Sequence, residues 1–171
     1  EDDDQWAEDI KDALRSAPNY IFVGEVRDAK AARQLLRAAT SGHTVLCTVH
    51  GSSVSESLSA IVQNAEQELG DMAYNLLAEG LTGVIYQNIV RGKPIVEIVE
   101  TLDSKNGGVD NVRQNIRGKK LNMLNSEIER QKALRLKKRE REEEREDEES
   151  GSKGSVPKSQ EIKRPVSRPQ S

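Results

Sequence analysis

The chain has 171 residues, which allows one folded domain at about 100–200 residues per domain. Only 35% of the residues are hydrophobic and 3% aromatic, whereas 32% are charged. Residues 1–110 hold 9 Lys and Arg against 18 Asp and Glu, and residues 111–171 hold 17 against 11, so the net charge of -3 hides an acidic part and a basic part. We therefore expect one domain of roughly 100 residues followed by a polar tail.

Several classes of protein are excluded by simple patterns. No run of about 18 apolar residues is present, so we expect no transmembrane segment. The N-terminus is acidic where a secretory signal is basic and then apolar, and the absence of Met at position 1 suggests a fragment or a processed product. Cys47 is the single cysteine, which excludes an internal disulfide and a cysteine-based zinc site. A reducing, cytoplasmic location agrees best with these features.

The first half of the chain alternates helical and strand patterns. Helical spacing over 4–15 is followed by an apolar run at 20–23, a second helical pattern over 28–39 and a second apolar run at 44–49. Gly42 lies where a left-handed residue is expected after the helix. Strand, helix and strand with short connections predict a βαβ unit of an α/β fold, with both strands buried on both faces.

The pattern continues with two helices and a pair of strands. Residues 53–56 read Ser-Val-Ser-Glu, a capping box that opens a helix, and residues 69–77 have the spacing of another amphipathic helix. Residues 84–90 and 95–102 read as strands joined by a turn, and we expect them to form a hairpin near the edge of the sheet.

The remaining residues change character after position 103. We expect the folded domain to span 1–103, a linker 104–110, a charged helical segment 111–149 and a disordered tail 150–171. Apolar residues in the charged segment keep helical spacing for about one heptad, which is too short for a coiled coil, at Leu121, Leu124 and Ile128.

Gly24 and Glu25 follow the first buried strand directly and form the most informative short motif. In phosphate-handling α/β proteins an acid at the carboxyl end of such a strand holds Mg²⁺ or orders a water. An isolated acid in this position is more commonly a residue that favours the start of the next helix, so the motif alone leaves both interpretations open.

The two histidines, His43 and His50, stand at opposite ends of the second strand. Seven steps of about 3.3 Å separate them by about 20 Å, so they cannot share a metal ion. His50 follows the carboxyl end of its strand and is expected at the same edge as Glu25. His43 is expected to order the turn between helix and strand.

Together, residues 19–28 and 37–50 resemble the secretion ATPase superfamily, the hexameric motors of type II and type IV secretion, type IV pili and conjugation. Tyr-Ile-Phe-Val-Gly-Glu-Val-Arg-Asp at 20–28 looks like the Walker B segment of that family, and Arg-Ala-Ala-Thr-Ser-Gly-His-Thr-Val-Leu-Cys-Thr-Val-His at 37–50 looks like its His box. Residues 81–90 also follow the family, and the resemblance covers about residues 5–102.

The resemblance implies the C-terminal portion of a RecA-like P-loop NTPase domain that uses ATP and Mg²⁺ and assembles into a homo-hexamer. By position, Glu25 would be the Walker B glutamate near Mg²⁺, and His43 and His50 would sense the γ-phosphate. Four further residues complete the motifs without a separate chemical role, namely Gly24, Arg27, Asp28 and Gly42. The family also implies partners among inner-membrane platform proteins and a cytoplasmic location, peripheral to the inner membrane.

The sequence departs from the family in what it lacks. No Gly-x-x-x-x-Gly-Lys-Ser/Thr phosphate loop occurs in the 171 residues, and the Asp box of the family would lie upstream of residue 1. Residues 59–61 offer no arginine, and Asn88 stands where arginine is frequent. The chain therefore looks like the C-terminal part of a motor, and we expect it to bind no ATP by itself.

Two alternatives of other classes remain open at this point. A degenerate ATPase half could serve as a scaffold that binds partners through its tail. A nucleic-acid binder could use the basic positions of 113–139, although no aromatic residue interleaves them and an acidic run follows.

Overall fold

The computed structural model describes residues 2–101 and 110–152. It divides into two compact units, Glu1–Ala133 and Leu134–Ser171, which are described separately. The expected linker at 104–110 and the expected tail at 150–171 lie outside the described residues, except that Asp110 precedes a helix and 150–152 end one.

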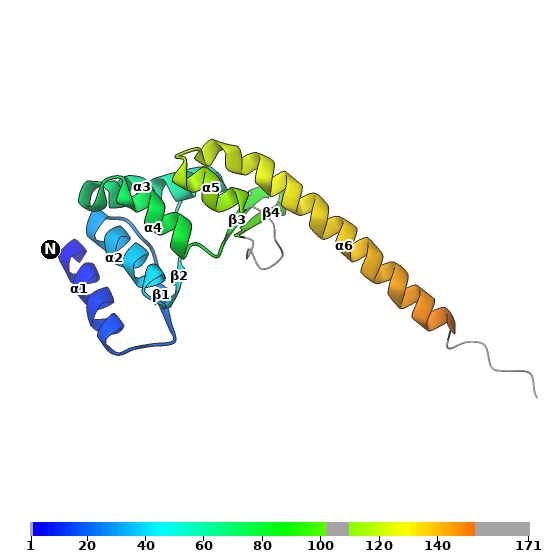
Figure 1. Cartoon of the computed structure of the whole chain (residues 1–171), viewed down its shortest axis with the longest axis horizontal. Coiled ribbons are helices and arrows are strands. Elements are labelled where there is room, and N and C mark those ends of the chain that lie inside the picture. The colour runs from blue at the N-terminus through cyan, green and yellow to red at the C-terminus, as the bar shows by residue number, and fades with distance from the viewer. Residues whose placement is uncertain (1, 102–109, 153–171) are drawn as a thin grey trace, which may run out of the picture. The chain divides into compact units, whose positions relative to one another are not determined.

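The first unit contains most of the helices and all of the strands in the described part of the chain (Figure 1). In chain order these are α1 (Asp2–Arg15), β1 (Tyr20–Val23), α2 (Ala29–Thr40), β2 (Thr44–Cys47), α3 (Val54–Leu69), α4 (Met72–Gly80), β3 (Gly83–Val90), β4 (Lys93–Glu100), α5 (Asn111–Arg117) and the short 3₁₀ helix η2 (Leu121–Met123). The last helix, α6 (Leu124–Ser152), begins in the first unit and supplies the second.

The predicted βαβ unit is present. β1 pairs in parallel with β2, from Tyr20 opposite Thr44 to Val23 opposite Cys47, and α2 is the connection between the strands. Asp28 caps the start of α2, because its side chain accepts a hydrogen bond from the Ala31 amide at 2.8 Å.

The predicted hairpin also forms, but as a sheet of its own. β3 pairs antiparallel with β4 through a turn at Arg91 and Gly92, whose φ angles of 50° and 75° are left-handed. The expectation that this hairpin lies at the edge of the first sheet is wrong for the described residues, where the two sheets share no pairing. β1 therefore pairs only with β2, and β3 only with β4, in the described part of the chain.

Glycine decides where two of the helices end. Gly42, with φ of 94°, follows α2 and lets the chain turn into β2, as the sequence predicts. Gly70, with φ of 54°, ends α3 directly after Leu69. The helix expected over 69–77 therefore begins later, at Met72.

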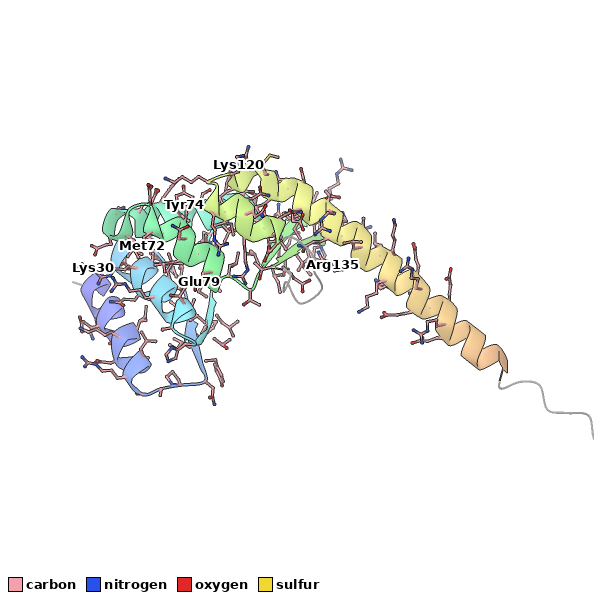
Figure 2. The ribbon with its side chains drawn as sticks, in the orientation of Figure 1. Lys30, Met72, Tyr74, Glu79, Lys120 and Arg135 are labelled. Carbon is pink, nitrogen blue, oxygen red and sulfur yellow. The ribbon has the colours of Figure 1, made fainter. Side chains whose placement is uncertain are left out.

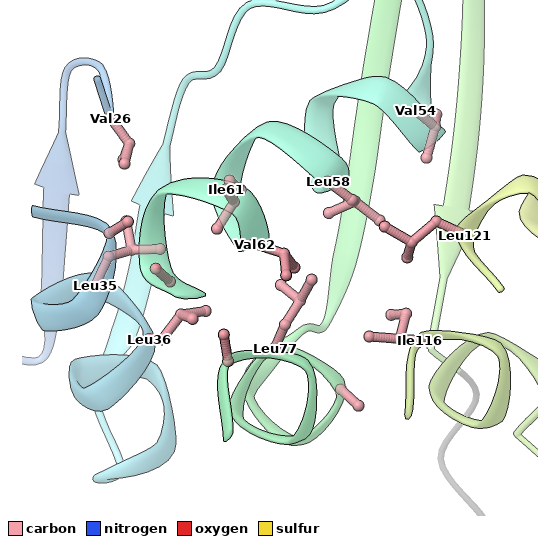
Figure 3. Packing of buried hydrophobic residues seen from close by; sticks show 14 of the residues in the cluster. Val26, Leu35, Leu36, Val54, Leu58, Ile61, Val62, Leu77, Ile116 and Leu121 are labelled. Carbon is pink, nitrogen blue, oxygen red and sulfur yellow. The ribbon is translucent and has the colours of Figure 1, made fainter. Parts of the chain in front are cut away.

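The core of the first unit is built by α2, α3 and α4 around apolar side chains (Figure 3). Leu36 of α2, Leu58 and Val62 of α3 and Leu77 of α4 are nearly inaccessible to solvent. Helical periodicity places these residues on one face of each helix, so the three faces meet. Burial of each such side chain stabilises the fold by about 1.5–3 kcal/mol relative to exposure.

The packed unit extends past the boundary expected at residue 103. Five apolar residues of α5, η2 and the start of α6 are buried in the same core, namely Val112, Ile116, Leu121, Leu124 and Ile128. The heptad spacing of the last three is too short for a coiled coil, but together the five side chains pack against the apolar faces of α3 and α4. The folded unit therefore needs these segments, which composition alone assigned to a polar tail.

The parallel strands are buried on one face only, which corrects the expectation of two buried faces. Ile21 and Val23 point into the core, whereas Tyr20 and Phe22 are 68% and 66% exposed. Successive side chains of a strand point to opposite sides, and the described helices cover a single side of this pair. The run is apolar throughout, but the face of β1 that carries Tyr20 and Phe22 is not covered by the described residues.

The second unit is the charged remainder of α6. Lys138 pairs with Glu142 and Arg139 with Glu143, each at 3.6 Å and four residues apart, as the charge pattern predicts. Figure 2 shows the side chains of this helix, with Arg135 labelled. Among the described residues, no helix combines the length and apolar character needed to cross a membrane.

Candidate functional site

The segment 24–28 joins β1 to α2 and carries the most notable polar contacts. Val26 is buried, and its amide donates a hydrogen bond to the Thr48 carbonyl oxygen at 3.3 Å. The Thr48 hydroxyl donates to the Gly24 carbonyl oxygen. These two bonds tie the connection to the residues that follow β2, so both strand ends stay together.

Glu25 and His50 lie in direct contact at these strand ends. Nε2 of His50 is 3.0 Å from Oε1 of Glu25, although the two residues are 25 positions apart in the chain. Parallel pairing causes this approach, because the carboxyl ends of neighbouring parallel strands lie at the same edge. The imidazole is 89% exposed, whereas the carboxylate is 22% exposed.

Arg27 occupies the other oxygen of the same carboxylate. Its guanidinium Nη2 donates to Oε2 of Glu25. This hydrogen bond is the main cause that lowers the pKa of Glu25, while partial burial opposes it and the charges of Arg27 and His50 add to it. The Glu25 side chain is therefore ionised at neutral pH.

The acid that caps the start of α2 is Asp28, not Glu25. Asp28 bonds the Ala31 amide, and the Glu25 carboxylate contacts side chains instead of the helix amides. The interpretation of Glu25 as a residue that merely favours the helix start therefore loses its basis, because that position is already filled.

His43 lies apart from this group of residues. Its amide donates to the Ala38 carbonyl oxygen at 3.4 Å, and its Nδ1 is 3.4 Å from the Ser41 hydroxyl oxygen. These contacts, beside Gly42, belong to the turn between α2 and β2. The structure thus places His43 where the sequence expected it, at the strand end opposite to His50.

The described residues form no complete metal site, and both oxygens of the Glu25 carboxylate already have side-chain partners. Mg²⁺ is usually held by one or two carboxylates together with waters and substrate phosphates. Glu25 supplies one ionised carboxylate. In the described ranges, 2–101 and 110–152, no cluster of three or more His, Cys, Asp or Glu could bind a metal alone.

Arg27 and Thr48 belong to the Walker B and His box segments of the sequence, but no contact was predicted for either residue. Thr48 ties the strand ends together, and Arg27 contacts Glu25. Residues 24–28 form no strand, so no alternation pattern signals the Arg27 contact. Nothing in the local pattern signals the Thr48 contact, which depends on the register between β1 and β2.

Basic residues of the 113–139 segment have partners within the chain. Arg113 donates to the Asp110 carboxylate and to backbone carbonyl oxygens at the end of α4, Lys119 donates to Asp71, and Arg130 donates to Glu127. Such contacts reduce the charge available for phosphates, so the geometry favours a structural part for these side chains over the nucleic-acid alternative.

The fold and the site define a class of α/β protein whose polar site lies at the carboxyl ends of parallel strands. A family model described as type II/IV secretion system protein matches residues 3–163. The chain belongs to this family, as the Walker B and His box resemblance predicts.

Several curated proteins match about half of the chain. The type IV pilus retractation ATPase PilT of Pseudomonas aeruginosa is 35% identical over 86 residues, which are 50% of this chain and 25% of PilT. The competence protein ComGA of Streptococcus pneumoniae is 36% identical over 88 residues, 52% of this chain and 26% of ComGA. The type II secretion system protein E of Dickeya dadantii is 35% identical over 86 residues, 50% of this chain and 16% of that protein.

Solved structures agree with the fold. The pilus retraction motor PilT with bound ADP superposes with a TM-score of 0.57 and 28% identity, over 71% of this chain and 35% of PilT. The Yersinia pseudotuberculosis ATPase DotB superposes with a TM-score of 0.59 over 73% of this chain and 33% of DotB, and its 23% identity supports the fold alone. The chain thus spans about a third of each of these two solved chains.

Proposed function

We propose that this chain carries the Walker B and His box part of a RecA-like ATPase that powers type II or type IV secretion, pilus dynamics or conjugative transfer. The contact between Glu25 and His50 at 3.0 Å carries the proposal. It joins two motifs that are distant in sequence at one edge of parallel strands, where ligands of α/β proteins bind.

Each site residue has a distinct part in this proposal. With MgATP bound, the ionised Glu25 carboxylate would hold water beside the metal and orient the attacking water, and exposed His50 would face the γ-phosphate. Mg²⁺ bound with ATP supplies charge neutralisation of the phosphates. His43 belongs to the same motif, and its contacts support a part in the turn before β2.

The proposed assembly follows from the relatives. Those relatives include a pilus motor and secretion proteins, so we place the chain in a homo-hexameric ring that acts beside inner-membrane platform proteins. We place this ring in the cytoplasm or at the cytoplasmic side of the inner membrane.

The proposal is tested by replacing Glu25 in the complete gene product. Glu25→Gln keeps the shape of the side chain and removes its charge, so we expect nucleotide binding to persist and the rate of ATP hydrolysis to fall by about 10²–10³-fold. Glu129→Gln is the matched control, because Glu129 is exposed on α6 and contacts only Lys132 at 3.8 Å among the described ion pairs. Unchanged turnover in Glu25→Gln would remove Glu25 from the proposed mechanism.

A second measurement separates the motor from the scaffold alternative. The 171-residue chain alone contains no Gly-rich phosphate loop, so calorimetric titration with MgATP should show no measurable binding. Hydrolysis by the complete gene product supports the motor. Absence of both binding and hydrolysis in the complete gene product would favour the scaffold.

A further inference from the structure

Arg27 is held beside Glu25 by the residues between and after them. Val26 turns inward and is nearly inaccessible to solvent, and the Glu25 and Arg27 side chains on either side of it meet in a hydrogen bond. The Val26 amide is bonded to Thr48, and Asp28 is bonded to the first turn of α2. The backbone is thus fixed on both sides of Arg27, which restricts where its guanidinium reaches.

The two oxygens of Glu25 have different partners. His50 contacts Oε1 at 3.0 Å, and Arg27 contacts Oε2. With one oxygen held by the guanidinium, rotation of the carboxylate away from His50 would break a charge-assisted hydrogen bond. Arg27 therefore restricts the orientation of the carboxylate relative to the imidazole.

The exposure of Arg27 argues that this contact has little value for folding. Its side chain is 76% exposed, and ion pairs at exposed positions contribute little to stability. The main physical consequence of the contact is the placement and the ionisation of Glu25. Neither effect requires Arg27 to touch a nucleotide.

We propose that Arg27 is a positioning residue that holds the Glu25 carboxylate against His50 before nucleotide binds. This inference rests on the proposed function of Glu25. Arg27 acts through Glu25 and makes no contact with the reacting atoms. A lysine at position 27 retains a charge but lacks the planar fork of the guanidinium, so it can replace arginine only in part.

The first test follows the Glu25 carboxyl carbon by NMR during a pH titration of the 171-residue chain. His50 and Arg27 are the charged groups that contact this carboxylate in the described residues, so the titration reports on them. We expect Arg27→Gln to raise the pKa of Glu25, and Arg27→Lys to raise it by less. Arg15→Gln, in the last turn of α1, is the matched control, because Arg15 is exposed and pairs with Asp12 rather than with Glu25, and it should leave the titration unchanged.

The second test measures ATP hydrolysis by the complete gene product with the same variants. Misplacement of Glu25 should lower kcat by about ten- to a hundredfold with little change in KM, and Arg27→Lys should recover part of the loss. Arg15→Gln should match the unmodified protein in both constants.

The outcomes separate this inference from the proposed function. If Glu25 titrates identically in Arg27→Gln, the inference is overturned while a slow Glu25→Gln variant still supports the function. If the titration moves and kcat does not, the ion pair exists but positions nothing of consequence. If Glu25→Gln itself hydrolyses ATP normally, the function fails, and the positioning role fails with it.

Discussion

Two regions of this chain each hold a glutamate against an arginine, and they differ in what surrounds the pair. Glu25, at the end of β1, is 22% exposed and contacts Arg27 and His50, which are 76% and 89% exposed. Glu127, in the first turn of α6, is 5% exposed and contacts Arg130. The glutamate is therefore partly open to solvent in one region and enclosed in the other, while both arginines reach solvent, with Arg130 42% exposed.

The enclosed region is saturated with internal partners. Glu127 also accepts a hydrogen bond from the buried side chain of Gln131 at 3.0 Å, and Gln131 in turn bonds the amide and carbonyl of Glu100. Buried polar groups are costly without such partners. The comparison teaches that Glu127 serves packing, whereas the partners of Glu25 are exposed side chains whose loss should cost the fold little.

The largest expected difference between the regions concerns apolar side chains. Leu124, at the start of α6, is fully buried, so Leu124→Ala should lower the free energy of unfolding by about 2–5 kcal/mol. Phe22 stands 66% exposed beside the site, and Phe22→Ala should change it by only about 0.5 kcal/mol. Urea denaturation measures both. Equal losses would show that the exposed face of β1 is covered in solution.

A smaller effect is expected from the enclosed glutamate itself. Glu127→Gln removes the charge that accepts hydrogen bonds from Arg130, and we expect a loss of about 1–3 kcal/mol in the free energy of unfolding. Glu25→Gln is the matched substitution in the open region and should leave the thermal midpoint essentially unchanged. A larger loss from Glu25→Gln would reverse the comparison.

The pH dependence of stability provides a third test. The hydrogen bond from Arg130 chiefly lowers the pKa of Glu127, with burial opposing it. A carboxyl with a lowered pKa in the folded state stabilises the protein above the ordinary glutamate pKa of about 4.3, and that stabilisation is lost as the pH falls through the folded value. The thermal midpoint should therefore fall on acidification below the ordinary range, and by less in Glu127→Gln. Equal acid sensitivity in both proteins would contradict this assignment.

The smallest effect is expected where α6 leaves the packed unit. Truncation after Ala133 removes only the charged helix, whose ion pairs contribute about 0.3–0.5 kcal/mol each, so the thermal midpoint should hardly change. Truncation after Ile128 also removes Gln131 and its bonds to Glu100, and the midpoint should fall by a few degrees. Equal midpoints in the two truncated chains would show that Gln131 contributes nothing.

The sequence predicted the elements whose causes are local. The strand and helix patterns of the βαβ unit, the left-handed Gly42 and the hairpin turn have local causes, and all are present. The joint position of Glu25 and His50 was also predictable, because it requires only that the two strands be parallel.

What could not be predicted depends on contacts distant in sequence. The composition after residue 103 resembles a tail, yet Ile116 and Leu124 fill the core because α3 and α4 leave an apolar surface for them. The exposed face of β1 looks buried in sequence, since an apolar run cannot show which of its sides is covered. Register and docking, which local patterns do not encode, decide both cases.

The side chain of Gln131 covers backbone groups at the end of β4 that could otherwise pair with another molecule. Its side-chain amide accepts from the Glu100 amide at 2.9 Å and donates to the Glu100 carbonyl oxygen at 2.8 Å, as a neighbouring strand would. The unpaired backbone groups along the edges of a two-stranded hairpin can pair with another chain and lead to aggregation. Because these two backbone groups are already satisfied, an incoming strand from another molecule has no hydrogen bonds to gain at that end of β4.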